Sequence, residues 1–355
     1  MASIFSPLTK NIGIDLGTST TQVYVEGRGI VLSEPSVMAT DERNSKMIAV
    51  GRAAEDLLSR SPETVKLHRP LVHGVIADYS VTRTMLGYIL SKCVRSVQRL
   101  RIMIGVPSAA SNVEKRAVME AVYQAGAKEA FLIETAAAAA LGVNLPVYDP
   151  IGNMVVDIGG GTTDIAVISL GGIVNSESLR IAGDKFDSDI IAYVKRAFNL
   201  MIGERTAEDI KFKVGAAYPE ARDETLDIRG RDLLTGLPKT VQITTKQVAE
   251  AIGASVSRIV ECVKKVLEET PPELSADIMD RGIILTGGGA LLFGLLQDGS
   301  LAVTAALLGY VLWRTAKRCG GGWIVLSVIC FAAGLLKERA LLLLLPLYLI
   351  GYVCT

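Results

Sequence analysis

Hydrophobic residues in the first 295 positions follow two patterns that alternate along the chain. Short apolar runs, such as Ile102–Val106 and Ile165–Leu170, have the length and the β-branched content of buried strands. Between them lie longer segments in which apolar residues recur every three or four positions, as they do from Met85 to Val97. Strands that alternate with helices in this manner predict an α/β fold.

The same order of elements occurs twice, and 355 residues are enough for about two domains. We therefore expect one half at 1–150, with a small lobe at about 33–74, and a second at 151–296, with a small lobe at about 182–245. The periodic segments predict helices over residues 52–59, 79–98, 112–125, 136–141, 190–198, 207–215 and 248–267.

A glycine-rich loop at residues 157–164 joins two apolar runs and reads Asp-Ile-Gly-Gly-Gly-Thr-Thr-Asp. Two strands with a glycine turn between them predict a hairpin. Glycines allow several backbone N–H groups to point at one place, as they do in phosphate-binding nests. Asp157 is placed to orient a metal-bound water, and Thr162 offers a hydroxyl group. Taken alone, the loop fits an ordinary glycine-rich turn equally well.

Two further loops favour the phosphate-binding interpretation. Residues 11–21 repeat the order strand, aspartate, glycine, hydroxyl residues, strand, with Asp15 in the place of Asp157. Residues 286–290 place three glycines after an apolar strand and before a helical run, whose first N–H groups can face an anion. Two matching hairpins and a third glycine turn predict a duplicated fold that holds a nucleotide from both sides.

These loops resemble the phosphate-1, phosphate-2 and adenosine motifs of the actin, heat-shock-70 and sugar-kinase superfamily. Within it, the chain is similar to the bacterial actins of the MreB/Mbl family, over about residues 9–295. The resemblance implies an actin-like ATPase fold, in which duplicated ribonuclease-H-like domains surround a nucleotide cleft. It also extends to stretches outside the loops, namely residues 34–37, 73–79, 105–107, 129–134, 180–187, 203–208 and 271–274.

The resemblance implies ATP and Mg²⁺ as cofactors and gives roles to individual residues. Asp15 and Asp157 would hold the waters of Mg²⁺, and Gly183 with Asp184 would close the cleft. The phosphates would lie against Gly17, Thr18, Ser19, Gly159, Gly160, Gly161 and Thr162, and the adenosine against Glu204, Lys211, Gly287, Gly288 and Gly289. Without the family context, Glu204 and Lys211 would be read as a solvated pair on a helix.

Hydrolysis requires a group that orients a water in line with the γ-phosphate. The family motif at this place is Ile-Glu-Glu-Pro, and its second glutamate positions the water, whereas this chain reads Ile133-Glu134-Thr135-Ala136. Thr135 occupies the water-positioning place, and a threonine hydroxyl cannot act as a general base near neutral pH. Glu134, one residue earlier, would point to the opposite side. Glu134, Thr135 and Thr162 are the catalytic candidates, and we expect ATP to bind but to be hydrolysed slowly.

Composition excludes several other kinds of site. The chain has 37 basic and 37 acidic residues, so no net positive charge indicates nucleic acid as a partner. Its five cysteines form no CxxC pair, and two histidines are too few for a histidine-based metal centre. No GxxxxGK[ST] motif is present, which excludes a P-loop enzyme.

The tail at residues 297–355 does not resemble the family. It contains three apolar runs, 301–313, 322–336 and 340–354, separated by spacers that contain Arg and Lys. Each run is shorter than the roughly 20 residues of a membrane span, but soluble helices are seldom apolar on all sides. We expect an apolar, helical membrane tail, and a misjoined sequence on a truncated bacterial actin is the alternative. The family elements that it replaces would complete the first domain, so part of that domain's apolar surface should be uncovered.

The leading functional hypothesis, by resemblance, is an ATP-binding cytoskeletal protein that polymerises beneath the membrane and directs cell shape and wall synthesis. Its partners would be further copies of itself, the cytoplasmic membrane, and membrane proteins of wall synthesis and elongation. It would be cytoplasmic and membrane-associated, and Pro7 argues against an amphipathic membrane helix within residues 1–10. The alternatives are a small-molecule kinase, a chaperone-type ATPase of the same superfold, or a non-functional truncated fusion.

Overall fold

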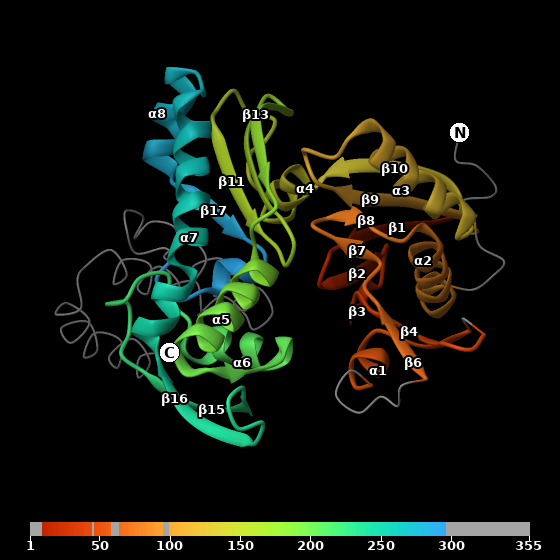
Figure 1. Ribbon diagram of the computed structural model, residues 1–355. Helices are drawn as coiled ribbons and strands as arrows, with labels where there is room; N and C mark the ends of the chain where they lie inside the picture. Colours follow the sequence, from red (N-terminus) through yellow and green to blue (C-terminus); the bar gives the residue numbers. More distant parts are fainter. Residues whose placement is uncertain (1–8, 45, 58–63, 95–98, 296–355) are drawn as a thin grey trace, which may run out of the picture.

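The computed structural model describes residues 9–44, 46–57, 64–94 and 99–295 of the chain. The predicted tail, the residues before Thr9 and part of the predicted helix at 52–59 lie outside these ranges. Figure 1 shows two α/β halves side by side, with one short helix, α4 (Thr135–Gly142), between them. None of the helices in the described ranges combines the length and the apolar character that a membrane span requires.

A five-stranded sheet forms the centre of the first half. Its first three strands run antiparallel as a meander, and two further strands pair in parallel beside β1. The strand predicted at the start of the chain is present, and its side chains Ile12, Ile14 and Leu16 are buried in the core. In sheet order the strands are β10 (Ala127–Glu134), β9 (Arg99–Val106), β1 (Thr9–Leu16), β2 (Thr20–Val25) and β3 (Gly29–Pro35).

Two helices cover one face of this sheet, α2 (Tyr79–Cys93) and α3 (Asn112–Gln124). The helix α3 begins at a reciprocal capping box between Ser111 and Glu114, which satisfies two N-terminal N–H groups. On the opposite face Tyr24, Met103 and Phe131 are about half exposed. A small lobe beside the sheet consists of β4 (Met38–Asp41), β5 (Met47–Val50), α1 (Arg52–Glu55), β6 (Val65–His68), β7 (Leu71–Val72) and β8 (Val75–Ile76).

The second half repeats this plan. Its sheet has the order β13 (Gly172–Leu179), β12 (Thr163–Ser169), β11 (Asn153–Ile158), β17 (Ile283–Thr286), again an antiparallel meander followed by a parallel strand. These strands correspond to β3, β2, β1 and β9, and among the described residues none corresponds to β10. Every residue of β12 is buried, which explains why this strand appears in the sequence as a continuous apolar run.

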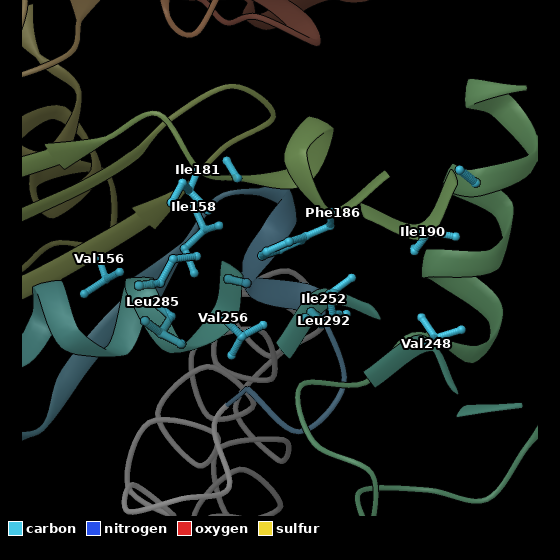
Figure 2. Close-up of a cluster of buried hydrophobic side chains, with 14 of the residues drawn as sticks. Val156, Ile158, Ile181, Phe186, Ile190, Val248, Ile252, Val256, Leu285 and Leu292 are labelled. Atoms are coloured by element: carbon cyan, nitrogen blue, oxygen red, sulfur yellow. The ribbon is translucent and has the colours of Figure 1, made fainter. Parts of the chain in front are cut away.

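Helices cover both faces of the second sheet. On one face lie α5 (Gly183–Phe198) and α7 (Thr245–Glu268), and Figure 2 shows their side chains Phe186, Ile190 and Ile252 packed with Ile158 and Leu285 of the strands. On the other face α4 contributes Ala136 and Ala140 to a smaller core. The remaining elements are the small lobe, β14 (Leu200–Met201), α6 (Glu204–Val214), β15 (Thr225–Asp232) and β16 (Pro238–Thr244), and the helix α8 (Pro272–Arg281).

Candidate functional site

The two glycine hairpins have the same internal geometry. In the first, the N–H of Gly17 donates to the carbonyl of Thr20 at 3.2 Å, and in the second the N–H of Gly159 donates to the carbonyl of Thr162 at 2.8 Å. Asp15 and Asp157 each precede the glycine by two positions and lie at the end of the first strand of their sheet. The sequence repeat is therefore a structural repeat.

The hairpins approach each other across the boundary between the halves. A Cβ on Gly160 would lie 1.9 Å from Ser19 Oγ, and one on Gly161 would lie 2.3 Å from Thr18 Oγ1. Ser19 Oγ also donates a hydrogen bond to Asp184 Oδ1 at 3.0 Å. Glycine is thus required at both positions because any side chain would push the halves apart.

The third glycine turn lies against the second hairpin. Gly287 has φ +83°, and a Cβ there would meet the carbonyl oxygen of Ile158 at 2.2 Å. Thr286, just before it, donates a hydrogen bond from Oγ1 to Asp157 Oδ1 at 3.0 Å. The turn continues into a 3-10 helix of four residues, Gly288–Leu291, in place of the predicted helical run.

A cavity of about 500 Å³ opens between the halves, which is a size that ligand sites of proteins commonly have. Most of the predicted site residues line it, whereas Glu134 and Glu204 do not. Glu204 instead forms an exposed ion pair at 2.9 Å with Arg69 of the first small lobe. The predicted residues that line the cavity are Asp15, Gly17, Thr18, Ser19, Thr135, Asp157, Gly159, Gly160, Gly161, Thr162, Gly183, Asp184, Lys211, Gly287, Gly288 and Gly289.

Three aspartates give one part of the cavity an unbalanced negative charge. The pKa of Asp157 is raised to about 6, mainly by burial and also by the neighbouring Asp164 and Asp15, while the Thr286 hydrogen bond opposes the rise. Burial also raises the pKa values of Asp15 and Asp164. A bound cation would relieve this repulsion.

The donor set fits Mg²⁺ held through water. Within the described ranges, no group of three or more His, Cys, Asp or Glu side chains is close enough to hold a metal ion by itself. Mg²⁺ usually keeps several waters and binds proteins through one or two carboxylates together with phosphate oxygens. Asp15 and Asp157 therefore fit the ion only when it arrives with a phosphate ligand.

Elsewhere the cavity carries the predicted Lys211 together with Glu208, Arg222 and Phe293, which were not predicted from the sequence. Lys211 and Glu208 come from α6, and Arg222 lies 5.2 Å from the centre of the Phe293 ring. Glu208 precedes Lys211 by three positions and so lies on the same helical face, which is the spacing that could have identified it. Asp164 belongs to the glycine motif, but no role was predicted for it from the sequence. Its burial in β12 makes it one of the three aspartates that give the cavity its negative charge.

Thr135 lies at the start of α4 and faces the cavity. Its Oγ1 is buried near the carboxylate of Asp164, whose pKa it lowers, and makes no hydrogen bond of ordinary length with a residue in the described part of the chain. Glu134 is the N-cap residue of this helix and lies outside the cavity lining. This is the arrangement on which the prediction of slow hydrolysis depends.

Two duplicated α/β halves, each with a glycine hairpin facing a shared cavity, define a protein of the actin-like class. The chain belongs to the MreB/Mbl family, because the sequence model of the MreB/Mbl protein family matches residues 9–304. The predicted family is thereby confirmed, as is the α/β, actin-like fold.

Relatives of known name and structure agree with this assignment. The chain is 52% identical over 290 residues to the cell shape-determining protein Mbl of Bacillus subtilis strain 168, covering 81% of this chain and 87% of the relative. It is 46% identical over 295 residues to the cell shape-determining protein MreB of Escherichia coli K12, covering 81% and 85%.

Two solved structures share the fold. MreB5 of Spiroplasma citri bound to ADP has a TM-score of 0.77 and 34% identity, with 88% of this chain and 99% of that chain covered. The MamK double helical filament has a TM-score of 0.70 at 22% identity, covering 88% and 92%, and supports the fold alone.

Proposed function

We propose that this chain binds ATP with Mg²⁺ between its two glycine hairpins and assembles with further copies into filaments that determine cell shape. The observation that carries the proposal is the matched pair of hairpins, each with its aspartate, facing one cavity. Relatives are named cell shape-determining proteins, and the solved MreB5 structures are bound to ADP or AMPPNP. The chain would act in the cytoplasm at the membrane, with wall-synthesis proteins as partners.

The cavity residues would divide the nucleotide between them. Backbone N–H groups of the hairpin loops would receive the phosphates, since closely spaced glycine N–H groups form anion-binding nests. Asp15 and Asp157 would hold Mg²⁺ through its waters, and the ion would neutralise charge on the phosphate oxygens. Lys211 and Glu208 would take the nucleoside.

Assembly would use the two opposite ends of the second half. The turn between β15 and β16 exposes Leu234, of which 81% is accessible, together with Leu233 and Leu237. At the other end α8 exposes Met279, of which 87% is accessible, and Tyr148 lies against the β12–β13 turn beside Leu170. Figure 1 shows the β15–β16 hairpin and α8 at opposite ends of this half. Head-to-tail contact between different surfaces generates open filaments.

The charges at the two ends are complementary. On the hairpin the exposed basic residues Arg229, Arg231 and Lys239 outnumber the exposed Asp227. At the α8 end the exposed acidic residues Asp149, Glu273 and Asp280 outnumber Arg281. Opposite charges on two apolar surfaces steer and orient their association.

Sedimentation with Mg·ATP tests the proposal. The full chain should pellet when Mg·ATP is added, and Leu234→Lys should raise the critical concentration for pelleting by about tenfold, since a buried charge at an interface costs at least about 1.4 kcal/mol. Ile30→Lys changes an equally large exposed side chain of the first half and serves as the control. No pellet from the unmodified chain, with phosphate transfer to a sugar in a parallel assay, would instead support the small-molecule kinase.

We also propose that residues 297–355 bring the chain to the membrane. The spacer with Arg314, Lys317 and Arg318 is the more basic one, so it should stay in the cytoplasm while the two later apolar runs cross as a hairpin. The full chain should remain in the membrane fraction after carbonate extraction, whereas a chain ending at Leu296 should be released. Release of the full chain as well would contradict a spanning tail and support a misjoined sequence.

A further inference from the structure

Lys211, which lines the cavity, is held by an acidic residue that does not line it. Its Nζ donates to Asp187 Oδ2 at 2.7 Å and to the carbonyl of Gly183 at 3.2 Å. The side chains of Lys211 and Asp187 are only 12% and 14% exposed. The lysine is thus fixed between two acceptors from α5 and is not a flexible surface cation.

Among the described residues, the hydrogen bonds of Lys211 leave one donor of the ammonium group unused. An ammonium carries three hydrogens, and two of them go to Asp187 and Gly183. The Lys211 Nζ also lies 5.3 Å from the centre of the neighbouring Phe212 ring. This is a cation–π contact and does not use one of the ammonium hydrogens as a hydrogen-bond donor. Because two hydrogens are bonded to acceptors on α5, those two bonds fix the direction in which the third hydrogen points.

We propose that Asp187 is a positioning residue, which acts through Lys211 to orient the ammonium toward an acceptor on the nucleoside. The inference rests on the proposed nucleotide binding in the same cavity. Asp187 itself touches no ligand, because it lies behind Lys211 and outside the cavity lining. Its second oxygen, Oδ1, is buried without a hydrogen bond to any described residue, so the carboxylate is held there at a cost in desolvation.

The charges around Asp187 make its ion pair with Lys211 sensitive to pH. The groups that face it are Lys211 and Glu208 from α6 and Asp184 from its own helix. Burial raises the pKa of Asp187 to about 6, with Lys211 opposing the rise and the two acidic neighbours adding to it. As the pH falls through about 6, the carboxylate takes up a proton and loses its hold on Lys211, so nucleoside affinity should fall in the same interval.

Adenosine without Mg²⁺ is the suitable probe, because it has no phosphate to engage Asp157, whose pKa also lies at about 6. By calorimetry on the full chain, Asp187→Asn should weaken adenosine binding about tenfold at about pH 8, the size expected for one charge-assisted hydrogen bond. It should also remove most of the decline in affinity between about pH 8 and about pH 5. Asp187→Glu, which retains a carboxylate, should keep that decline.

A double-mutant cycle separates positioning from a general structural effect. In a Lys211→Met background, Asp187→Asn should cause no further loss of adenosine affinity. Asp189→Asn is the matched control, since Asp189 lies on the same helix and is bonded to Lys185 and Ser255 away from the cavity. A full tenfold loss that persists in the Lys211→Met background, or unchanged affinity in Asp187→Asn, would overturn the inference. Failure of the unmodified chain to bind either adenosine or Mg·ATP would overturn the nucleotide proposal itself.

Discussion

Replacing Asp157 with alanine should weaken Mg²⁺-dependent ATP binding by about 10–100-fold, the range seen when an outer-sphere partner of a metal is lost. Asp157 is the penultimate residue of β11, lines the cavity and has its Oδ1 fixed by the Thr286 hydroxyl at 3.0 Å. The loss should appear only when Mg²⁺ is present, because the carboxylate acts on the ion and not on the phosphates.

Calorimetric titration with ATP, with and without Mg²⁺, measures this effect directly. Asp227→Ala removes an exposed aspartate of β15 and should leave both affinities unchanged. If Asp157→Ala binds Mg·ATP as the unmodified chain does, the assignment of this cavity to the nucleotide is wrong.

The same residue makes the nucleotide-free protein sensitive to pH. The pKa of Asp157 is raised by folding from its ordinary value of 3.8 to about 6. The folded state therefore holds the proton more tightly than the unfolded state, and stability that is present below about pH 4 is lost as the pH rises through about 6. Asp157→Asn should reduce this loss of thermal stability, which gives the metal assignment an independent check.

Much of the site could be predicted from the sequence because its parts are local. Each hairpin places an aspartate, a glycine and hydroxyl residues within a few positions, so strand and turn chemistry determine their relation. The match of Asp15 and Asp157 in two loops then indicated a shared cavity. Contacts between distant segments, such as that of Ser19 with Asp184, required the structure because no local rule sets them.

At the nucleoside end the structure places the two residues that the resemblance paired in different surroundings. Glu204 and Lys211, seven positions apart, were predicted to act together, and the structure places Glu204 in an ion pair with Arg69 outside the cavity. Glu208 lines the cavity with Lys211 instead, one helical turn away. Glu204 at the first turn of α6 thus faces Arg69 of the first small lobe, and Glu208 and Lys211 further along the helix face the cavity.

Element boundaries differed for physical reasons that sequence periodicity does not contain. The helix α5 was predicted from Ile190 but begins at Gly183, because Gly183 and Asp184 donate their N–H groups to the carbonyls of Gly159 and Gly160. The hairpin of the same half therefore stabilises the start of the helix. That start has no side-chain cap, so a search for capping residues would not have located it.

Thr135→Glu should raise the rate of ATP hydrolysis about tenfold or more, since a positioned general base supplies roughly 10²–10⁴-fold. Thr135 faces the cavity, and its buried Oγ1 lies near the carboxylate of Asp164 without a hydrogen bond of ordinary length to a described residue. Thr135 and Asp15 both lie close to Gly105. A Cβ on Gly105 would lie 3.3 Å from Thr135 Cγ2 and 3.9 Å from Asp15 Oδ1. A glutamate at this position is longer than the threonine that it replaces, so its carboxylate would extend further into the cavity, beside the aspartates.

Those neighbours also favour the basic role, because nearby like charges raise the pKa of a carboxylate and so make it a stronger base. Single-turnover release of phosphate measures the rate, with ATP affinity followed in parallel so that a binding change is not mistaken for chemistry. Thr135→Gln has the same length without the base and should stay near the unmodified rate, and Glu134→Ala should have little effect because Glu134 lies outside the cavity lining. An equal increase in the glutamine variant would mean that orienting the water matters and proton transfer does not. An unchanged rate in Thr135→Glu would show that another residue already positions the water.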